Sequence, residues 1–483
     1  MSKHVIAIDQ STSATKVFLL DSEGNIVRRF SKNHKQFYPK DGYVEHDAQE
    51  IFENVREGIN KVAKGVEGIA AIGISNQRET TVLWDKKTGK PVCRAVVWQD
   101  VRGAALCESL KNHAETIQRQ TGIPLSPYFP AAKAASVLNG NPEIRQKAED
   151  GSLLIGTVDS YLIYRLTGCK VFQTDVSNAS RTQLMALDTL CWSEEICELF
   201  SVPVNCLAKI VPSDAYFGAD AETGIPITGV MGDSHAALFG QGCHKKGMAK
   251  ATYGTGSSVM MNIGTEPALS TSGLATSVGF AFKGQICYVL EGNVTCSGDT
   301  LVWLKEDMGL IADIAEAETI ASEAAETSGV YLVPAFSGLG APHGDAKARA
   351  LICGMNRGTK KKHIIRAAIE SIAYQDADVI VAMEGDMGSR LQELKADGGP
   401  TQNALLMQFQ ADLLNCPVQC AAAGELSALG AGYMAGISAK VYENFEAVCL
   451  KSGKRYEPQM DKAKRVELLA GWKTAVKRCL KID

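Results

Sequence analysis

The sequence predicts an α/β protein built of two similar lobes. Apolar runs typical of buried strands alternate with helical stretches along the chain, which favours α/β architecture. At 483 residues the chain is too long for one ordinary hydrophobic core, so two domains, or three, are expected. Two short turns rich in small and hydroxyl-bearing residues, one in each half, indicate that the lobes are alike.

The first of these turns occupies residues 9–16, between the apolar runs 5–8 and 17–20. Two apolar runs joined by a short polar segment are typical of a β-hairpin. The turn carries one carboxylate, Asp9, several hydroxyls and Lys16. Its small side chains let backbone N–H groups approach an anion, and a carboxylate can hold a hydrated Mg²⁺ ion. The segment therefore predicts a phosphate-binding hairpin, with an ordinary edge hairpin as the alternative.

The second turn, KATYGTGSS, occupies residues 250–258 and precedes the apolar run 259–261. Like the first, it combines small residues and hydroxyls beside an apolar run. One such turn in each half of the chain predicts two lobes that close on one nucleotide.

Polar residues follow three predicted strands in the N-terminal half. In α/β sheets, ligand-contacting residues lie at the carboxyl ends of strands, so these positions predict a binding site. The strands are expected at 69–75, 95–98 and 227–232, followed by residues 76–79, by Gln99 and Asp100, and by Asp233, with a helix beginning near His235.

The best domain boundary is the Gly- and Lys-rich segment 242–247. It predicts an N-terminal domain of residues 1–245 and a C-terminal domain of residues 246–483. The second half is expected to contain a helix around 367–374, a strand running into a glycine turn at 394–399, a helix at 405–410 and a charged tail of helical pattern from about residue 443.

Composition narrows the class of function. Hydrophobic residues make up 45% of the chain and charged residues 22%, as in soluble globular proteins, and a net charge of −4 argues against nucleic-acid binding. We find no signal-peptide pattern and no apolar stretch that would span a bilayer, so a cytoplasmic location without a membrane partner is expected. The fourteen cysteines are scattered singly, which favours small core residues over disulfides or zinc ligands.

Phosphoryl transfer to a hydroxyl needs neutralisation of phosphate charge, in-line placement and a base for the acceptor proton. A Walker A loop is absent, because neither Gly-Lys pair, at Lys90 or Lys454, has the upstream glycine, and the protein-kinase signatures are missing too. The phosphate contacts are therefore expected from the paired turns. Asp9 suits a hydrated metal and Asp233 suits the base, although Asp233 could instead cap the following helix.

Neighbouring Arg78 and Glu79 offer a donor and an acceptor side by side, which suits a substrate rich in hydroxyls, since each hydroxyl both donates and accepts. The alternative is a surface ion pair. Trp98 and Tyr128 could form an apolar wall against the carbon–hydrogen faces of such a substrate, or could be ordinary core residues.

Together, these residues and several longer segments resemble the FGGY family of carbohydrate kinases, from residue 5 to about residue 436. The family has two ribonuclease H-like domains of the actin-like ATPase type, with the active site in the cleft between them. The segments that carry the resemblance are GYVEHD at 42–47, NQRETT at 76–81, GTVD at 156–159, NASRT at 178–182, VPAFSGLGAP at 333–342 and the stretch 350–370.

The resemblance implies an enzyme that uses ATP and Mg²⁺ to phosphorylate a terminal hydroxyl of a small polyol, with glycerol first. It implies Asp233 as the catalytic base, Mg²⁺ near Asp9, and a homodimer or homotetramer as the assembly. Polyol-binding positions are Arg78, Glu79, Tyr128 and Asp233, and the nucleotide-binding positions are Thr12, Ser13, Ala14, Lys16, Thr255, Gly298, Gly399 and Asn403.

Departures from the family pattern bear on the substrate. Members that phosphorylate glycerol usually carry Gln where this chain has Ser234, and a Phe that packs on the glycerol carbons where it has Ser258. Trp98 keeps the opposite wall. The lost aromatic wall should weaken glycerol binding by about 1–3 kcal/mol and make room for a longer substrate. In the first turn, Ser11 replaces the usual Gly and Lys16 the usual Arg, which keeps the charge but loses the bidentate contact.

Three alternatives follow. The first is a kinase of a larger polyol or ketose, such as erythritol, xylitol, xylulose or ribulose. The second is a non-catalytic actin-like ATPase, which would not need Arg78, Glu79 and Asp233 together. The third is a sugar sensor without chemistry, which would be expected to lack Asp9 or Asp233, yet both are present.

Overall fold

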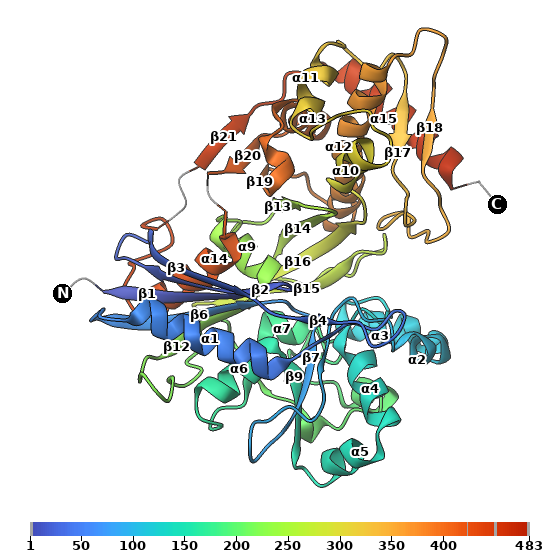
Figure 1. Ribbon diagram of the computed structural model, residues 1–483. Helices are drawn as coiled ribbons and strands as arrows, with labels where there is room; N and C mark the ends of the chain where they lie inside the picture. Colours follow the sequence, from blue (N-terminus) through green and yellow to red (C-terminus); the bar gives the residue numbers. More distant parts are fainter. Residues whose placement is uncertain (1–2, 423, 449–451, 481–483) are drawn as a thin grey trace.

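The computed structural model describes residues 3–422, 424–448 and 452–480. The chain forms two lobes, one above the other in Figure 1, and each lobe is built around a mixed sheet of its own. The lower lobe is formed by the N-terminal half of the chain and the upper lobe by most of the C-terminal half (Figure 1).

The N-terminal sheet has the strand order β12-β6-β1-β2-β3. β1, β2 and β3 are antiparallel neighbours, whereas β6 and β12 run parallel to β1. Helix α1 packs on this sheet through Ile51, Val55 and Ile59, which are buried at helical spacing, and the Asp47 side chain caps its N-terminus. The bounds are β1 His4–Gln10, β2 Ala14–Leu20, β3 Ile26–Asn33, α1 Ala48–Ala63, β6 Ile69–Asn76 and β12 Ile227–Gly232.

The C-terminal sheet repeats this pattern within the order β15-β16-β14-β13-β19-β20-β21. β13, β14 and β16 are antiparallel neighbours, and β19 and β20 run parallel to β13. This duplicated arrangement confirms the expected pair of similar lobes. The bounds are β13 Met248–Tyr253, β14 Ser257–Gly264, β15 Ala275–Phe282, β16 Gln285–Val294, β19 Glu393–Asp397, β20 Val418–Ala421 and β21 Ser452–Tyr456.

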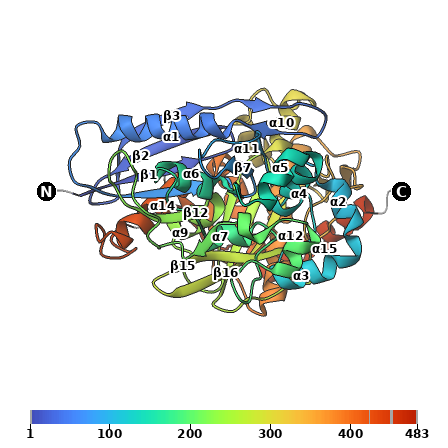
Figure 2. The ribbon, with the colours of Figure 1, turned by 90° about the horizontal axis from the view of Figure 1, so that it is seen from below.

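Smaller sheets and further helices complete both lobes. Figure 2, seen from below, shows α1 along one side of the N-terminal lobe and α2 to α5 grouped near its opposite end. No described helix is both long and apolar enough to cross a membrane. The strands are β4 Gln36–Phe37, β5 Glu45–His46, β7 Thr81–Asp85, β8 Ala95–Val96, β9 Leu153–Thr157, β10 Gln173–Asp175, β11 Lys209–Val211, β17 Tyr331–Val333 and β18 Leu351–Cys353. The helices are α2 Ala104–Ser109, α3 Ala114–Thr121, α4 Pro130–Gly140, α5 Pro142–Glu149, α6 Val158–Leu166, α7 Val176–Ser180, α8 Glu194–Leu199, α9 Asp233–Gly240, α10 Asp299–Glu306, α11 Glu316–Ser322, α12 Lys361–Met387, α13 Ala404–Leu414, α14 Leu426–Ser438 and α15 Lys462–Cys479, with short 3₁₀ helices η1 Lys111–His113, η2 Val204–Cys206 and η3 Gly399–Gln402.

The expected elements are largely present, with one correction in the tail. The predicted strands at 69–75 and 227–232 are β6 and β12, and the predicted helices at 367–374 and 405–410 lie within α12 and α13. The tail from about residue 443 is not helical throughout, because β21 precedes α15. β21 pairs antiparallel with β20 and so gives the edge of the C-terminal sheet the hydrogen bonds that it would otherwise lack.

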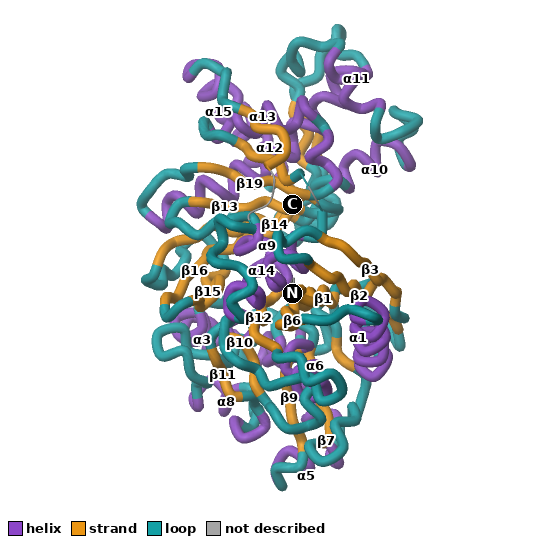
Figure 3. Tube along the Cα trace, turned by 90° about the vertical axis from the view of Figure 1, so that its left-hand side faces the viewer, coloured by secondary structure: helices purple, strands orange, loops and turns teal. Residues whose placement is uncertain are grey.

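Helix α14 comes from the C-terminal half of the chain but packs on the N-terminal sheet, against β1, β6 and β12, and also against α9. Figures 1 and 3 both place α9 and α14 between the two large sheets. Glycines allow this close approach: a Cβ on Gly430 would lie 1.8 Å from the carbonyl oxygen of Ala236, and one on Gly73 would lie 2.3 Å from that of Ala431. The two helices and the sheet are therefore in backbone-to-backbone contact.

We expect Gly430→Ala to destabilise the protein by about 3 kcal/mol, because the new methyl group meets backbone atoms of α9 that cannot move aside locally. The measurement is the midpoint of denaturant unfolding. Gly385→Ala is the control: it also lies in a helix, but open space surrounds its Cβ position, so it should raise the midpoint slightly. Equal effects of the two variants would contradict the tight packing of α14.

Candidate active site

A cavity of about 580 Å³ lies where the two lobes meet. Part of its lining comes from the strands that the two turns join, with Asp9 and Lys16 on β1 and β2 and Lys250 and Thr252 on β13. The turns predicted at 9–16 and 250–258 are shorter in the structure, residues 11–13 and 254–256, because the residues on either side of them pair as strands. We call this cavity the phosphate cavity. Its charged or hydroxyl-bearing lining includes Asp9, Lys16, Asp233 and Ser234 from the N-terminal half and Lys250, Thr252, Asp397, Thr401, Glu425 and Ser427 from the C-terminal half.

Asp9 is a buried residue of β1, one position before its end, and accepts a hydrogen bond from Ser75 Oγ at 3.0 Å. Burial, together with the negative charge of Asp233, raises the pKa of Asp9 to about 7. A bound cation would relieve both effects, because it favours the ionised carboxylate. Carboxylate oxygens are also the ligands that Mg²⁺ prefers, so the residues present fit a magnesium ion.

Lys16 points into the same cavity and pairs with Glu425, Nζ to Oε2 at 2.7 Å. Glu425 is the residue before α14 and adopts a left-handed backbone conformation, with φ of 64°. The lysine of the first turn is thus held by a carboxylate that the C-terminal half supplies.

Arg78 is the centre of a buried cluster of charges beside the phosphate cavity. Its two terminal nitrogens donate to the two carboxylate oxygens of Glu291 at 2.7 and 2.8 Å. Its Nε lies 3.2 Å from Asp233 Oδ1 and 3.6 Å from Glu79 Oε1. The carboxylate of Glu291 therefore holds Arg78 in place, and the Nε of Arg78 faces the carboxylates of Asp233 and Glu79.

Arg181 closes this cluster from the other side. Its Nε donates to Glu79 Oε1 at 2.8 Å, and its Nη1 lies 3.0 Å from Glu291 Oε2. Burial alone would raise the pKa of Glu291, but the guanidinium groups of Arg181 and Arg78 bring it well below its usual value. Glu291 thus remains ionised and holds both arginines in place.

Asp233 is the carboxylate of the cluster that remains accessible. Its side chain is 35% exposed, against 3% for Glu79 and 0% for Glu291. It is the first residue of α9 and accepts the backbone N–H of the adjacent Ser234 at 2.6 Å. The N-cap position of α9 is Gly232 and has no side-chain hydrogen bond, so the alternative in which Asp233 caps this helix is wrong. Burial raises the pKa of Asp233 while Arg78 lowers it, and the net shift is upward. This gives a carboxylate suited to accepting a proton.

Two aromatic rings stand next to the first turn. The ring centroids of Trp98 and Tyr128 lie 5.6 Å apart, and Trp98 Nε1 donates to Thr12 Oγ1 at 2.9 Å. Ser258 Oγ lies 3.5 Å from Glu291 Oε1. An aromatic pair therefore lies near the charged cluster through Tyr128, and the residue at position 258 beside Glu291 is small and polar.

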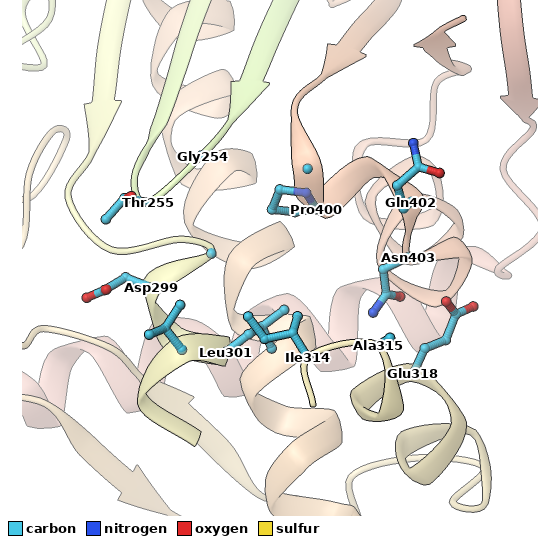
Figure 4. A pocket seen from close by; sticks show the side chains of 13 residues that line it. Gly254, Thr255, Asp299, Leu301, Ile314, Ala315, Glu318, Pro400, Gln402 and Asn403 are labelled. Atoms are coloured by element: carbon cyan, nitrogen blue, oxygen red, sulfur yellow. The ribbon is translucent and has the colours of Figure 1, made fainter. Parts of the chain in front are cut away.

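A second cavity, of about 490 Å³, lies within the upper lobe. Figure 4 shows Thr255, Leu301, Ile314, Asn403 and Glu318 around it. Its mixture of apolar walls and a few polar groups suits the base and sugar of a nucleotide. Gly399 and Gln402 line both cavities, so the two are adjacent and we call this one the nucleoside cavity.

The predicted nucleotide residues fall into three places. Thr255, Gly298, Gly399 and Asn403 line the nucleoside cavity, and Lys16 lines the phosphate cavity. Thr12 and Ser13 lie in the turn that connects β1 to β2, and Ala14 begins β2; these three line neither cavity.

Sequence reasoning assigned no role to Glu291, Arg181 or Lys250. Glu291 carries the clearest signal, because a lone carboxylate interrupts the apolar strand β16. Arg181 and Lys250 lie within the sequence segments 178–182 and 250–258, and both are 1% exposed.

The duplicated fold and the two adjoining cavities define a two-domain kinase. The chain belongs to the FGGY family of carbohydrate kinases: the family's N-terminal domain matches residues 4–240 and its C-terminal domain matches residues 249–439.

Curated relatives are similar to this chain over nearly its whole length. The chain is 47% identical to glycerol kinase 1 of Thermotoga maritima, covering 99% of both chains, and 45% identical to glycerol kinase of Caldanaerobacter subterraneus subsp. tengcongensis, covering 100% and 99%. Among solved structures, Plasmodium falciparum glycerol kinase with ADP matches with a TM-score of 0.96 at 38% identity, covering 99% of this chain and 98% of that one. The xylulose kinase of Lactobacillus acidophilus shares the fold, with a TM-score of 0.90 at 23% identity and coverage of 100% and 99%.

Proposed function

We propose that the protein transfers the γ-phosphoryl group of ATP to a terminal hydroxyl of glycerol, giving glycerol 3-phosphate and ADP. The observation that carries the proposal is the accessible carboxylate of Asp233, fixed beside Arg78 at the edge of the phosphate cavity. The relatives of similar length that are named glycerol kinases support glycerol as the acceptor.

In this mechanism, Arg78 and Glu79 orient the hydroxyls of glycerol, since one donates hydrogen bonds and the other accepts them. Asp233 takes the proton of the terminal hydroxyl. The hydroxyl oxygen then bonds to the γ-phosphorus, while the bond from that phosphorus to the oxygen bridging it to the β-phosphate breaks and ADP leaves. Mg²⁺ held near Asp9 would neutralise charge on the phosphates.

The test is ADP release in a coupled assay with glycerol, erythritol, xylitol, dihydroxyacetone, xylulose and ribulose at equal concentrations. We expect the highest kcat/KM with glycerol. A longer polyol or ketose that exceeds glycerol by about tenfold would overturn glycerol as the substrate and leave the kinase assignment in place.

A longer substrate is the second candidate, and the environment of Ser258 favours it. The small side chain near Glu291 leaves one wall of the site without an aromatic ring. Such a site could admit one or more additional hydroxymethine units.

Ser258→Phe should raise kcat/KM for glycerol relative to xylitol by about tenfold, because a ring at this position would pack on the carbons of a short substrate and block a long one. Ser258→Ala is the matched control, since it removes the hydroxyl without filling the space, and it should leave the ratio within about twofold. An unchanged ratio in Ser258→Phe would show that this wall does not select substrate length.

A further inference from the structure

Lys250 is a buried lysine on the wall of the phosphate cavity. It takes no part in the proposed mechanism, which uses Arg78, Glu79, Asp233 and Asp9. It lies in the middle of β13 and is 1% exposed, yet it lines the cavity together with Asp9, Lys16 and Asp233. A buried ammonium group is costly unless its hydrogen bonds and charge are satisfied.

The ammonium group of Lys250 has fewer hydrogen-bond acceptors than N–H groups among the described residues. Its Nζ donates to Thr252 Oγ1 at 3.0 Å, and Thr252 Oγ1 in turn donates to Asp397 Oδ2 at 3.0 Å. Asp397 also accepts from Gln241 Nε2 at 2.7 Å. Within residues 3–422, 424–448 and 452–480, we find no ion pair to the Lys250 ammonium, whereas Lys16 is paired with Glu425. Of its three N–H groups, one therefore has a partner among the described residues.

The carboxylates that line the phosphate cavity would repel a phosphoryl group, and the ammonium of Lys250 could offset that repulsion. Asp9, Asp233 and Asp397 all line the cavity, and a phosphoryl group entering it would meet these carboxylates. Transfer of a phosphoryl group requires its charge to be balanced where the bonds change. Lys250 places a cationic group on the same cavity wall as the base. Burial lowers the pKa of Lys250, whereas the nearby carboxylates of Asp397, Glu291 and Asp233 favour its charged form.

We propose that the Lys250 ammonium contacts the γ-phosphoryl group of the nucleotide and stabilises it during transfer. The inference rests on the proposed function, because it takes a nucleoside triphosphate as the occupant of the two cavities. The competing explanation is purely structural: Lys250 would hold Asp397, through Thr252, and thereby the glycine turn that begins at Gly398.

Lys250→Met, which keeps most of the side-chain volume, separates the two explanations. We expect kcat to fall about 100-fold, as when one preorganised donor to a developing charge is removed. Calorimetry should show affinity for the β,γ-imido analogue of ATP with Mg²⁺ falling about tenfold, and affinity for ADP with Mg²⁺ staying within about twofold. An unchanged kcat, or an equal loss of affinity for both nucleotides, would overturn the proposal.

Two further variants complete the test. Lys395→Met is the control, because Lys395 is the register partner of Lys250 on β19 but pairs with Glu393 at 2.7 Å and does not line the cavity; its kinetics should stay unchanged. Lys250→Arg keeps the charge and should retain the preference for the triphosphate analogue, even if Lys250→Met does not fold. Loss of that preference in Lys250→Arg would overturn the role of the charge.

The nucleotide affinities can be measured without glycerol or any other phosphoryl acceptor. If the wild-type protein phosphorylates no glycerol, the proposed function fails, and the comparison of the imido analogue with ADP still decides the role of Lys250.

Discussion

Asp233→Asn lowers kcat for glycerol phosphorylation by about 10³-fold, the expected loss when a general base is replaced by a side chain that cannot take a proton. Glycerol affinity should change little, because the amide retains an oxygen toward Arg78 Nε, 3.2 Å away in the wild type. Coupled ADP release gives the rate, and calorimetry gives the affinity.

The control for this variant is Asp220→Asn. Asp220 also pairs with an arginine, Arg56, at 2.5 Å, but it lines neither cavity, so kcat should be retained. Because the pKa of Asp233 is raised, kcat/KM of the wild type should decline with falling pH sooner than an ordinary aspartate would predict. Substantial activity of Asp233→Asn would remove Asp233 as the base and reopen the non-catalytic alternatives.

Glu291→Gln should destabilise the protein by about 3–5 kcal/mol, the range expected when one partner of a buried ion pair is removed. The amide leaves the buried guanidinium groups of Arg78 and Arg181 without the carboxylate that they share. Chemical denaturation measures the loss. Since Arg78 also faces Asp233, KM for the polyol should rise in the same variant.

A surface ion pair provides the comparison. Glu57 contacts Lys32 and Lys61 on the exposed side of α1, so Glu57→Gln should leave the unfolding midpoint unchanged. If Glu291→Gln is equally neutral, the charged cluster contributes little to stability and its role is confined to the substrate.

The sequence predicted the parts of the site that follow directly from local pattern. Hydrophobic runs located β1, β2, β6 and β12, and the carboxyl ends of β6 and β12 then brought Arg78 and Asp233 together. The second turn was predicted in the same way, from small residues next to an apolar run, but at 250–258 instead of the observed 254–256, because composition does not mark where strand pairing begins.

The remaining parts depend on contacts that local pattern does not contain. Glu291 reaches Arg78 across 213 residues of sequence, and Arg181 reaches Glu79 across 102. The sequence next to Glu291 or Arg181 contains no pattern that would identify the residue it contacts. β21 was missed for a related reason: its five residues become a strand because β20 offers an unpaired edge.

The origin of α14 has a consequence for the order in which the protein can fold during synthesis. Val5, Ala7 and Ala71 of the N-terminal sheet share a hydrophobic cluster with Leu429 and Met434 of α14. The ribosome makes these strands early and α14 near the end of the chain. One face of the first sheet must therefore remain without its native cover while most of the polypeptide is translated, and a fragment ending at the predicted domain boundary would keep that apolar face open for chaperones or for aggregation.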